Sequence, residues 1–152
     1  MNVPLHLALA LVLPMGPLAN DKPKTEEKAL SKTERPCIEH FSKDGGFFKG
    51  TTYKTWQEFA GADKDKVFQN VAQAVASNSW GTVNANKDLG IITAGQAVTM
   101  GQGSVAPLNV VVKQKSGGPV RVEVTFATGP GQVASADTVR TELCKLLEAA
   151  VE

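Results

Sequence analysis

The sequence predicts an α+β fold, an antiparallel sheet of about five strands with two helices packed on one face, in the order β-α-β-β-β-β-α. Two segments in its second half alternate valine with polar residues, the period of a half-buried strand. Two other segments place apolar residues three and four apart, the spacing of a helix with one buried face. Turn-forming residues separate these segments, which favours a single compact domain.

The N-terminal segment predicts export. Residues 3–19 are uncharged, and residues 5–13 are apolar apart from His6, which is typical of the hydrophobic core of a signal peptide. We therefore predict a signal peptide at residues 1–19, although no lysine or arginine precedes the core and Pro17 suits the cleavage pattern poorly. A buried N-terminal helix is the alternative. A membrane anchor would need about 20 apolar residues.

Residues 20–50 are predicted to be a linker. Residues 20–36 contain only Ala29 and Leu30 as apolar side chains, so this charged stretch buries too little surface to offset the entropy of ordering. Residues 37–50, rich in glycine, are interpreted as a transitional segment. The remaining residues, 51–152, are long enough for one α+β domain.

The first half of that domain predicts a strand, a helix and a hairpin. Residues 51–59 are rich in threonine and aromatic residues, which favours a strand. Asp63 or Asp65 can cap a helix over residues 64–77. Residues 80–85 and 89–94 then predict two short strands joined by a turn.

The second half predicts a loop, two strands and a helix. Residues 99–107 show no apolar periodicity and are interpreted as a loop. Residues 108–113 and 120–126 alternate around a glycine-rich turn, which places Lys113, Arg121 and Glu123 in solvent. Ser135 or Asp137 can cap a final helix with an apolar stripe that has Cys144 near its edge.

The two cysteines of the predicted mature chain, Cys37 and Cys144, favour a disulfide, because an even number of cysteines in an exported protein favours pairing. Two separate thiols are the alternative. The chain has 16 basic and 15 acidic residues, interleaved, and a net charge of +1. Such a balance argues against a nucleic-acid partner, which needs clustered cations.

Catalytic and metal-binding patterns are sparse. His40 would be the one imidazole left after signal removal. Cys37 and His40 have a C-x-x-H spacing, but structural zinc takes four ligands and the chain offers too few. Neither a metal nor another cofactor is therefore expected. Glu58, beside Trp56 near a strand end, and His40 are the residues to test if the protein is an enzyme.

The aromatic residues near the first predicted strand suggest a binding face of Tyr53, Trp56 and Glu58. Aromatic side chains on an edge strand are the kind of surface enriched at interfaces. Core packing under the helices is the alternative.

Residues 52–100 combine an aromatic strand, the D-x-D-x-V-F start of a helix, W-G-x-V and D-x-G-I-I-T-A. This order resembles small bacterial envelope modules, including the helix-grip domains of accessory lipoproteins in outer-membrane protein assembly and uncharacterised periplasmic domains. The chain lacks the cysteine that accepts a lipoprotein's lipid. The resemblance implies a non-catalytic module that contacts other envelope components, and it transfers no functional residue.

We therefore expect a periplasmic or secreted, non-enzymatic binding or scaffold domain with no stable membrane span, which engages another envelope protein through a sheet edge or face. A binder of a small apolar ligand or lipid is the first alternative, with space left between sheet and helices by small residues: Ala72, Ala74, Ala76, Gly95 and Ala97. An enzyme of unrecognised type is the second alternative.

Overall fold

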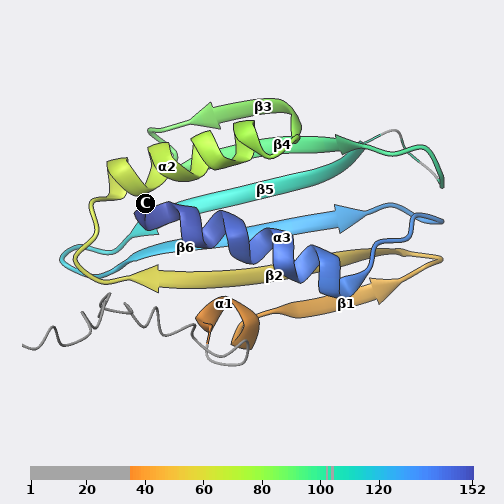
Figure 1. The fold of residues 1–152 in the computed structure, drawn as a ribbon, viewed down its shortest axis with the longest axis horizontal. Helices are drawn as coiled ribbons and strands as arrows, with labels where there is room; N and C mark the ends of the chain where they lie inside the picture. Colours follow the sequence, from red (N-terminus) through yellow and green to blue (C-terminus); the bar gives the residue numbers. More distant parts are fainter. Residues whose placement is uncertain (1–34, 102, 104) are drawn as a thin grey trace, which may run out of the picture.

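The computed structural model describes residues 35–101, 103 and 105–152. The predicted signal peptide and residues 20–34 of the predicted linker lie outside the described residues. The described chain forms one six-stranded antiparallel sheet in the order β1-β2-β6-β5-β4-β3 (Figure 1). The strands are β1 (Ser42–Gly46), β2 (Gly50–Phe59), β3 (Gly81–Asn86), β4 (Ile91–Ala97), β5 (Val105–Gln114) and β6 (Val120–Thr128). The helices are α1 (Pro36–Glu39), α2 (Lys64–Ser77), α3 (Ala136–Glu148) and the 3-10 turn η1 (Ala149–Val151).

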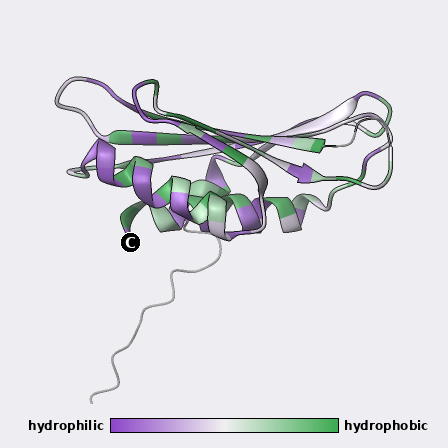
Figure 2. Ribbon diagram, turned by 90° about the horizontal axis from the view of Figure 1, so that it is seen from above, coloured by the Kyte–Doolittle hydropathy of each residue, from purple (hydrophilic) through white to green (hydrophobic). Residues whose placement is uncertain are grey.

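The α+β class and the antiparallel sheet are confirmed. Helices α2 and α3 both lie on one side of the sheet, and no helix of the described residues covers the other side (Figure 2). The predicted element count is wrong, because the described chain has six strands and three α-helices rather than about five and two. The additional elements, α1 and β1, precede the first predicted strand.

Strand β1 explains most of that difference. It pairs antiparallel with β2, from Ser42 opposite Lys54 to Gly46 opposite Gly50. Its sequence, SKDGG, is exposed along nearly its whole length and has no apolar alternation that could indicate a strand. The sheet therefore includes residues 42–46, which the sequence placed in the transitional segment.

The core lies between the sheet and the two long helices. Alternate residues of the paired strands β5 and β6 are fully buried on the helix-covered face: Leu108, Val110, Val112, Val120, Val122 and Val124. Helix α2 covers them with Val67, Phe68, Val71 and Val75, and α3 with Val139, Leu143, Leu146 and Leu147. The predicted alternation is confirmed, and it sends Lys113, Arg121 and Glu123 to the helix-free face.

Helix α2 has the predicted bounds. The side chain of Asp63 accepts a hydrogen bond from the backbone N–H of Lys66 at 2.8 Å, which satisfies one of the free donors of the first turn. After the C-cap residue Asn78, Ser79 adopts a φ of 61°, a left-handed conformation in which glycine is usual. This bend leads the chain into β3.

Cys37 and Cys144 form a disulfide between α1 and α3, with their α-carbons 5.6 Å apart. Both residues are buried, and the Thr55 hydroxyl donates a hydrogen bond to the carbonyl oxygen of Cys37. The bridge therefore holds the short helix against β2 and α3. Among the described residues no helix has both the length and the apolar character needed to cross a membrane.

Candidate functional site

The predicted binding face is divided between the two sides of the sheet. Tyr53 lies on the helix-covered side and is only 1% exposed, and its hydroxyl donates a hydrogen bond to the Ala134 carbonyl oxygen at 3.0 Å. Trp56 and Glu58 lie on the helix-free side, because an odd and an even position of one strand point to opposite faces. The structure therefore brings Trp56 and Glu58 together and places Tyr53 in the core.

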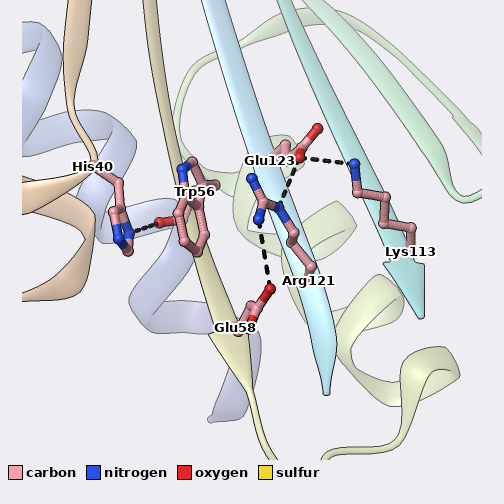
Figure 3. Close-up of polar contacts among 6 residues, drawn as sticks. All are labelled: His40, Trp56, Glu58, Lys113, Arg121 and Glu123. Atoms are coloured by element: carbon pink, nitrogen blue, oxygen red, sulfur yellow. Dashed lines mark hydrogen bonds and ion pairs between the residues drawn. The ribbon is translucent and has the colours of Figure 1, made fainter. Parts of the chain in front are cut away.

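Trp56 is stacked between two other side chains on the helix-free face (Figure 3). The imidazole of His40 lies 3.4 Å from the indole, centroid to centroid, with an angle of 10° between the planes. The guanidinium of Arg121 lies on the other side of the indole, 3.7 Å from its centroid. His40 Nδ1 also donates a hydrogen bond to the Trp56 carbonyl oxygen at 3.0 Å.

Arg121 also joins the stack to a row of ion pairs. Its guanidinium is 3.5 Å from the Glu58 carboxylate and, through Nε, 2.7 Å from Glu123, which accepts a further contact from Lys113 Nζ at 2.8 Å. The hydrogen bond from Lys113, helped by Arg121, lowers the pKa of Glu123 against a smaller opposing effect of burial. We call these six residues, His40, Trp56, Glu58, Lys113, Arg121 and Glu123, the Trp56 cluster.

The side chains of the Trp56 cluster are held by stacking and ion pairs. Of its two candidate catalytic groups, His40 stacks on one face of the indole, whereas Glu58 pairs with Arg121 on the other side of it (Figure 3). Because Cys37 is in a disulfide, the C-x-x-H pattern has no free thiolate to offer a metal. Within the part of the chain that the structure describes, no group of three or more His, Cys, Asp and Glu residues is placed to hold a metal ion.

A second candidate site is a cavity of about 590 Å³ on the helix-covered side, which we call the end pocket. It lies where the loops that follow β4 and β6 meet the start of α3 and the residues after α2. Its inner wall is apolar, with Trp80, Phe126 and Val139. The rings of Trp80 and Phe126 meet edge to face at 5.6 Å. Polar lining is supplied by Gln96, Thr138 and Glu142, among others.

The walls of the end pocket are tied together by hydrogen bonds. Gln132, itself buried, accepts one from the backbone N–H of Gly129 at 2.8 Å, and its Nε2 lies 3.5 Å from the Gly103 carbonyl oxygen. This side chain links the loop after β6 to the loop after β4. The bond from Tyr53 to Ala134 fixes the chain just before α3.

Sequence reasoning did not find the end pocket. Of the small residues expected to leave space for a ligand, only Ala97 lines it. Ala72, Ala74 and Ala76 lie along α2 and do not line the end pocket. Gly95 leaves no free space either, because the Val105 side chain packs where its Cβ would be. The lining comes from three stretches that are distant in sequence, within residues 78–80, 96–106 and 126–142. Their shared signal in the sequence is weak: residues 95–107 and 127–135 contain no charged residue.

No protein-family model matches this sequence, and no curated protein matches it either.

Proposed function

We propose that this domain is a non-enzymatic binding module of the periplasm or the extracellular space, and that it holds a small apolar molecule in the end pocket. One observation carries the proposal: a concave cavity of about 590 Å³ with an aromatic and aliphatic inner wall. Small-molecule sites usually measure about 300–1,000 Å³ and combine such walls with a few polar groups.

The chemistry of the lining supports an apolar ligand. Glu142, the charged residue of the lining, is paired with Lys145 at 2.8 Å. An unpaired charge on the ligand would therefore meet no free counter-charge and would lose hydration without compensation. A hydrocarbon chain or an apolar ring system with a neutral polar end suits the cavity best.

The disulfide supports the proposed compartment. Such bonds persist where the environment is oxidising, as in the periplasm and outside the cell. The apolar N-terminal segment supports export to the same compartments. The resemblance of residues 52–100 to small envelope modules agrees with a binding role.

Native mass spectrometry of the purified protein tests the ligand. We expect a co-purifying apolar species that Gln96→Trp displaces, because the larger side chain fills the pocket from the end of β4. Gln73→Trp, the same change on the exposed surface of α2, is the matched control and should retain the ligand. A ligand-free wild type that also fails to bind fatty acids and fluorescent apolar probes would refute the proposal.

A second candidate function is the binding of another envelope protein through the helix-free face. The observation that favours it is the Trp56 cluster, since tryptophan and arginine are enriched in the centres of interfaces. Photo-cross-linking in the cell from position 54, which lies on this face, should then capture one partner. Trp56→Ala should abolish that product, and cross-linking from position 73 on α2 should not yield it.

A further inference from the structure

We propose that one end of the domain docks on the surface of a lipid bilayer with anionic headgroups. This surface, the loop end, consists of residues 46–50, 98–101 and 129–133 together with Val105. In Figure 1 these loops lie at the right-hand end of the sheet, beyond the arrowheads of β1, β4 and β6. The inference goes beyond the proposed function, because it concerns the outer surface of the loops and does not require a ligand in the pocket.

Exposed apolar side chains are concentrated at the loop end. The described residues include eight large apolar side chains that are exposed, and five of them belong to this end: Phe47, Phe48, Met100, Val105 and Val133. Three are almost fully in solvent, with exposed fractions of 88% for Phe48, 83% for Val133 and 77% for Met100. Scattered apolar residues are normal on a surface, but a cluster of this kind marks an interaction site.

The loop end is also poor in charged residues. Its three loop segments contain a single charged residue, Lys49. The loops at the opposite end, residues 60–63, 87–90 and 115–119, carry four charged residues: Asp63, Lys87, Asp88 and Lys115. A surface that enters the headgroup region must leave water, and each carboxylate there would add a desolvation cost and repel anionic lipids.

The three loops form one connected platform. The backbone N–H of Gly131 donates a hydrogen bond to the Phe47 carbonyl oxygen at 2.8 Å, which joins the loop after β6 to the β1–β2 hairpin. Gly101 packs on the same loop so closely that a Cβ there would lie 2.6 Å from the carbonyl carbon of Gly131. The apolar side chains are therefore presented together from a braced surface.

The shape and chemistry of the loop end fit a membrane. Phe47 and Phe48 lie at the tip of the β1–β2 hairpin, with their rings edge to face at 5.3 Å. A protein partner would need a pocket of matching shape to receive these exposed rings. A bilayer interface accepts projecting aromatic rings without such a pocket. Lys49 follows them directly and can reach lipid phosphates while its aliphatic stem stays among the acyl chains.

The end pocket opens onto the same surface. Met100 and Val133 line the pocket and are also among the exposed side chains of the loop end. A docked domain would therefore present the mouth of the pocket to the lipid, so that an apolar molecule could pass between them without crossing water.

Co-sedimentation of the full chain with vesicles tests this inference. We expect binding to vesicles of phosphatidylethanolamine and phosphatidylglycerol, and weaker binding to phosphatidylcholine vesicles. The double variant Phe47→Ser/Phe48→Ser should lower the partition coefficient at least about tenfold, because two phenyl rings no longer leave water. Leu89→Ser, which removes a side chain that is 67% exposed at the opposite end, should bind like the wild type. All variants share the same N-terminal segment.

The orientation is tested separately by fluorescence. Phe48→Trp should gain an emission component that brominated lipids quench, and Leu89→Trp should not. Equal partition of the wild type and the double variant, or equal quenching at both positions, would overturn the inference. Concentration-dependent dimers that the double variant abolishes, without vesicle binding by the wild type, would overturn it too and would assign the loop end to a second copy of the chain.

The two proposals fail in different ways. Gln96→Trp fills the pocket and leaves the loop end unchanged, so vesicle binding should persist in this variant. If the wild type carries no pocket ligand but binds vesicles, and Phe47→Ser/Phe48→Ser loses that binding, only the proposed function is refuted.

Discussion

The imidazole of His40 lies parallel to the indole of Trp56, with 3.4 Å between ring centroids and an angle of 10° between the planes. His40 is the residue after α1, whereas Trp56 is in the middle of β2. The stack therefore holds the end of α1 against the sheet.

We predict that His40→Ala lowers the free energy of unfolding by about 1 kcal/mol, since it removes both the stack and the hydrogen bond to the Trp56 carbonyl. His40→Phe keeps an aromatic ring and should recover part of the loss. Urea unfolding followed by circular dichroism measures both values. An unchanged His40→Ala variant would show that the stack contributes nothing to stability.

Loss of the disulfide should have the largest effect on stability. Cys37 and Cys144 are 107 residues apart in the sequence, and a bridge across so long a loop strongly restricts the unfolded chain. The Cys37→Ser/Cys144→Ser variant should lose about 3–5 kcal/mol of unfolding free energy relative to the oxidised protein. A reducing agent should destabilise the wild type to the same level and leave the double variant unaltered, which serves as the control.

The stability of the domain should depend on Glu123 at acidic pH. Its pKa is lowered in the folded state from an ordinary value of 4.5, so its contribution is present above that pH and is lost as the pH falls through the folded value. Glu123→Gln should therefore cost about 1 kcal/mol or less near neutral pH, and its difference from the wild type should shrink as the pH falls below 4.5. Lys113→Met removes the main hydrogen-bond donor and should weaken this pH dependence. A constant difference from pH 7 to pH 3 would contradict the assignment.

Ser79 provides a test of backbone strain. Its φ of 61° is costly for a residue with a side chain, so Ser79→Gly should raise the unfolding free energy by about 1 kcal/mol. Ser77→Gly, two residues earlier at the end of α2, should instead lower it by about the same amount. Chemical denaturation of the two variants beside the wild type gives both signs. A Ser79→Gly variant that is no more stable than the wild type would mean that the conformation of Ser79 carries no cost.

The sequence was a good guide wherever local chemistry decides structure. Helix α2 begins after the Asp63 cap and ends at Ser77 as predicted, because capping and one apolar stripe fix both its bounds and its buried face. The alternation in β5 and β6 correctly predicted which side chains face the helices. Strand β1 was missed because it owes its structure to pairing with β2 and has almost no buried side chain of its own.

The candidate sites depended more on tertiary structure. The three-residue spacing of Tyr53 and Trp56 already implied opposite faces of a strand, so their separation was available from the period of two. The stack of His40 on Trp56 could not be predicted in this way, since His40 lies in a turn whose path is set by the disulfide and by β1. The end pocket joins segments from three parts of the chain, and no local sequence pattern indicates that they meet.

The order of the strands has a consequence for synthesis. Strand β2, the second in the chain, finds one neighbour in β1 and the other in β6, the last strand, with nine residue pairs from Thr51 opposite Thr128 to Phe59 opposite Val120. A nascent chain cannot complete this part of the sheet until residue 128 has left the ribosome, because the pairing joins distant parts of the sequence. The β2–β6 pairing, and with it the native sheet, can therefore form only after most of the chain has been synthesised, whereas the β5–β6 hairpin needs no residue before 105.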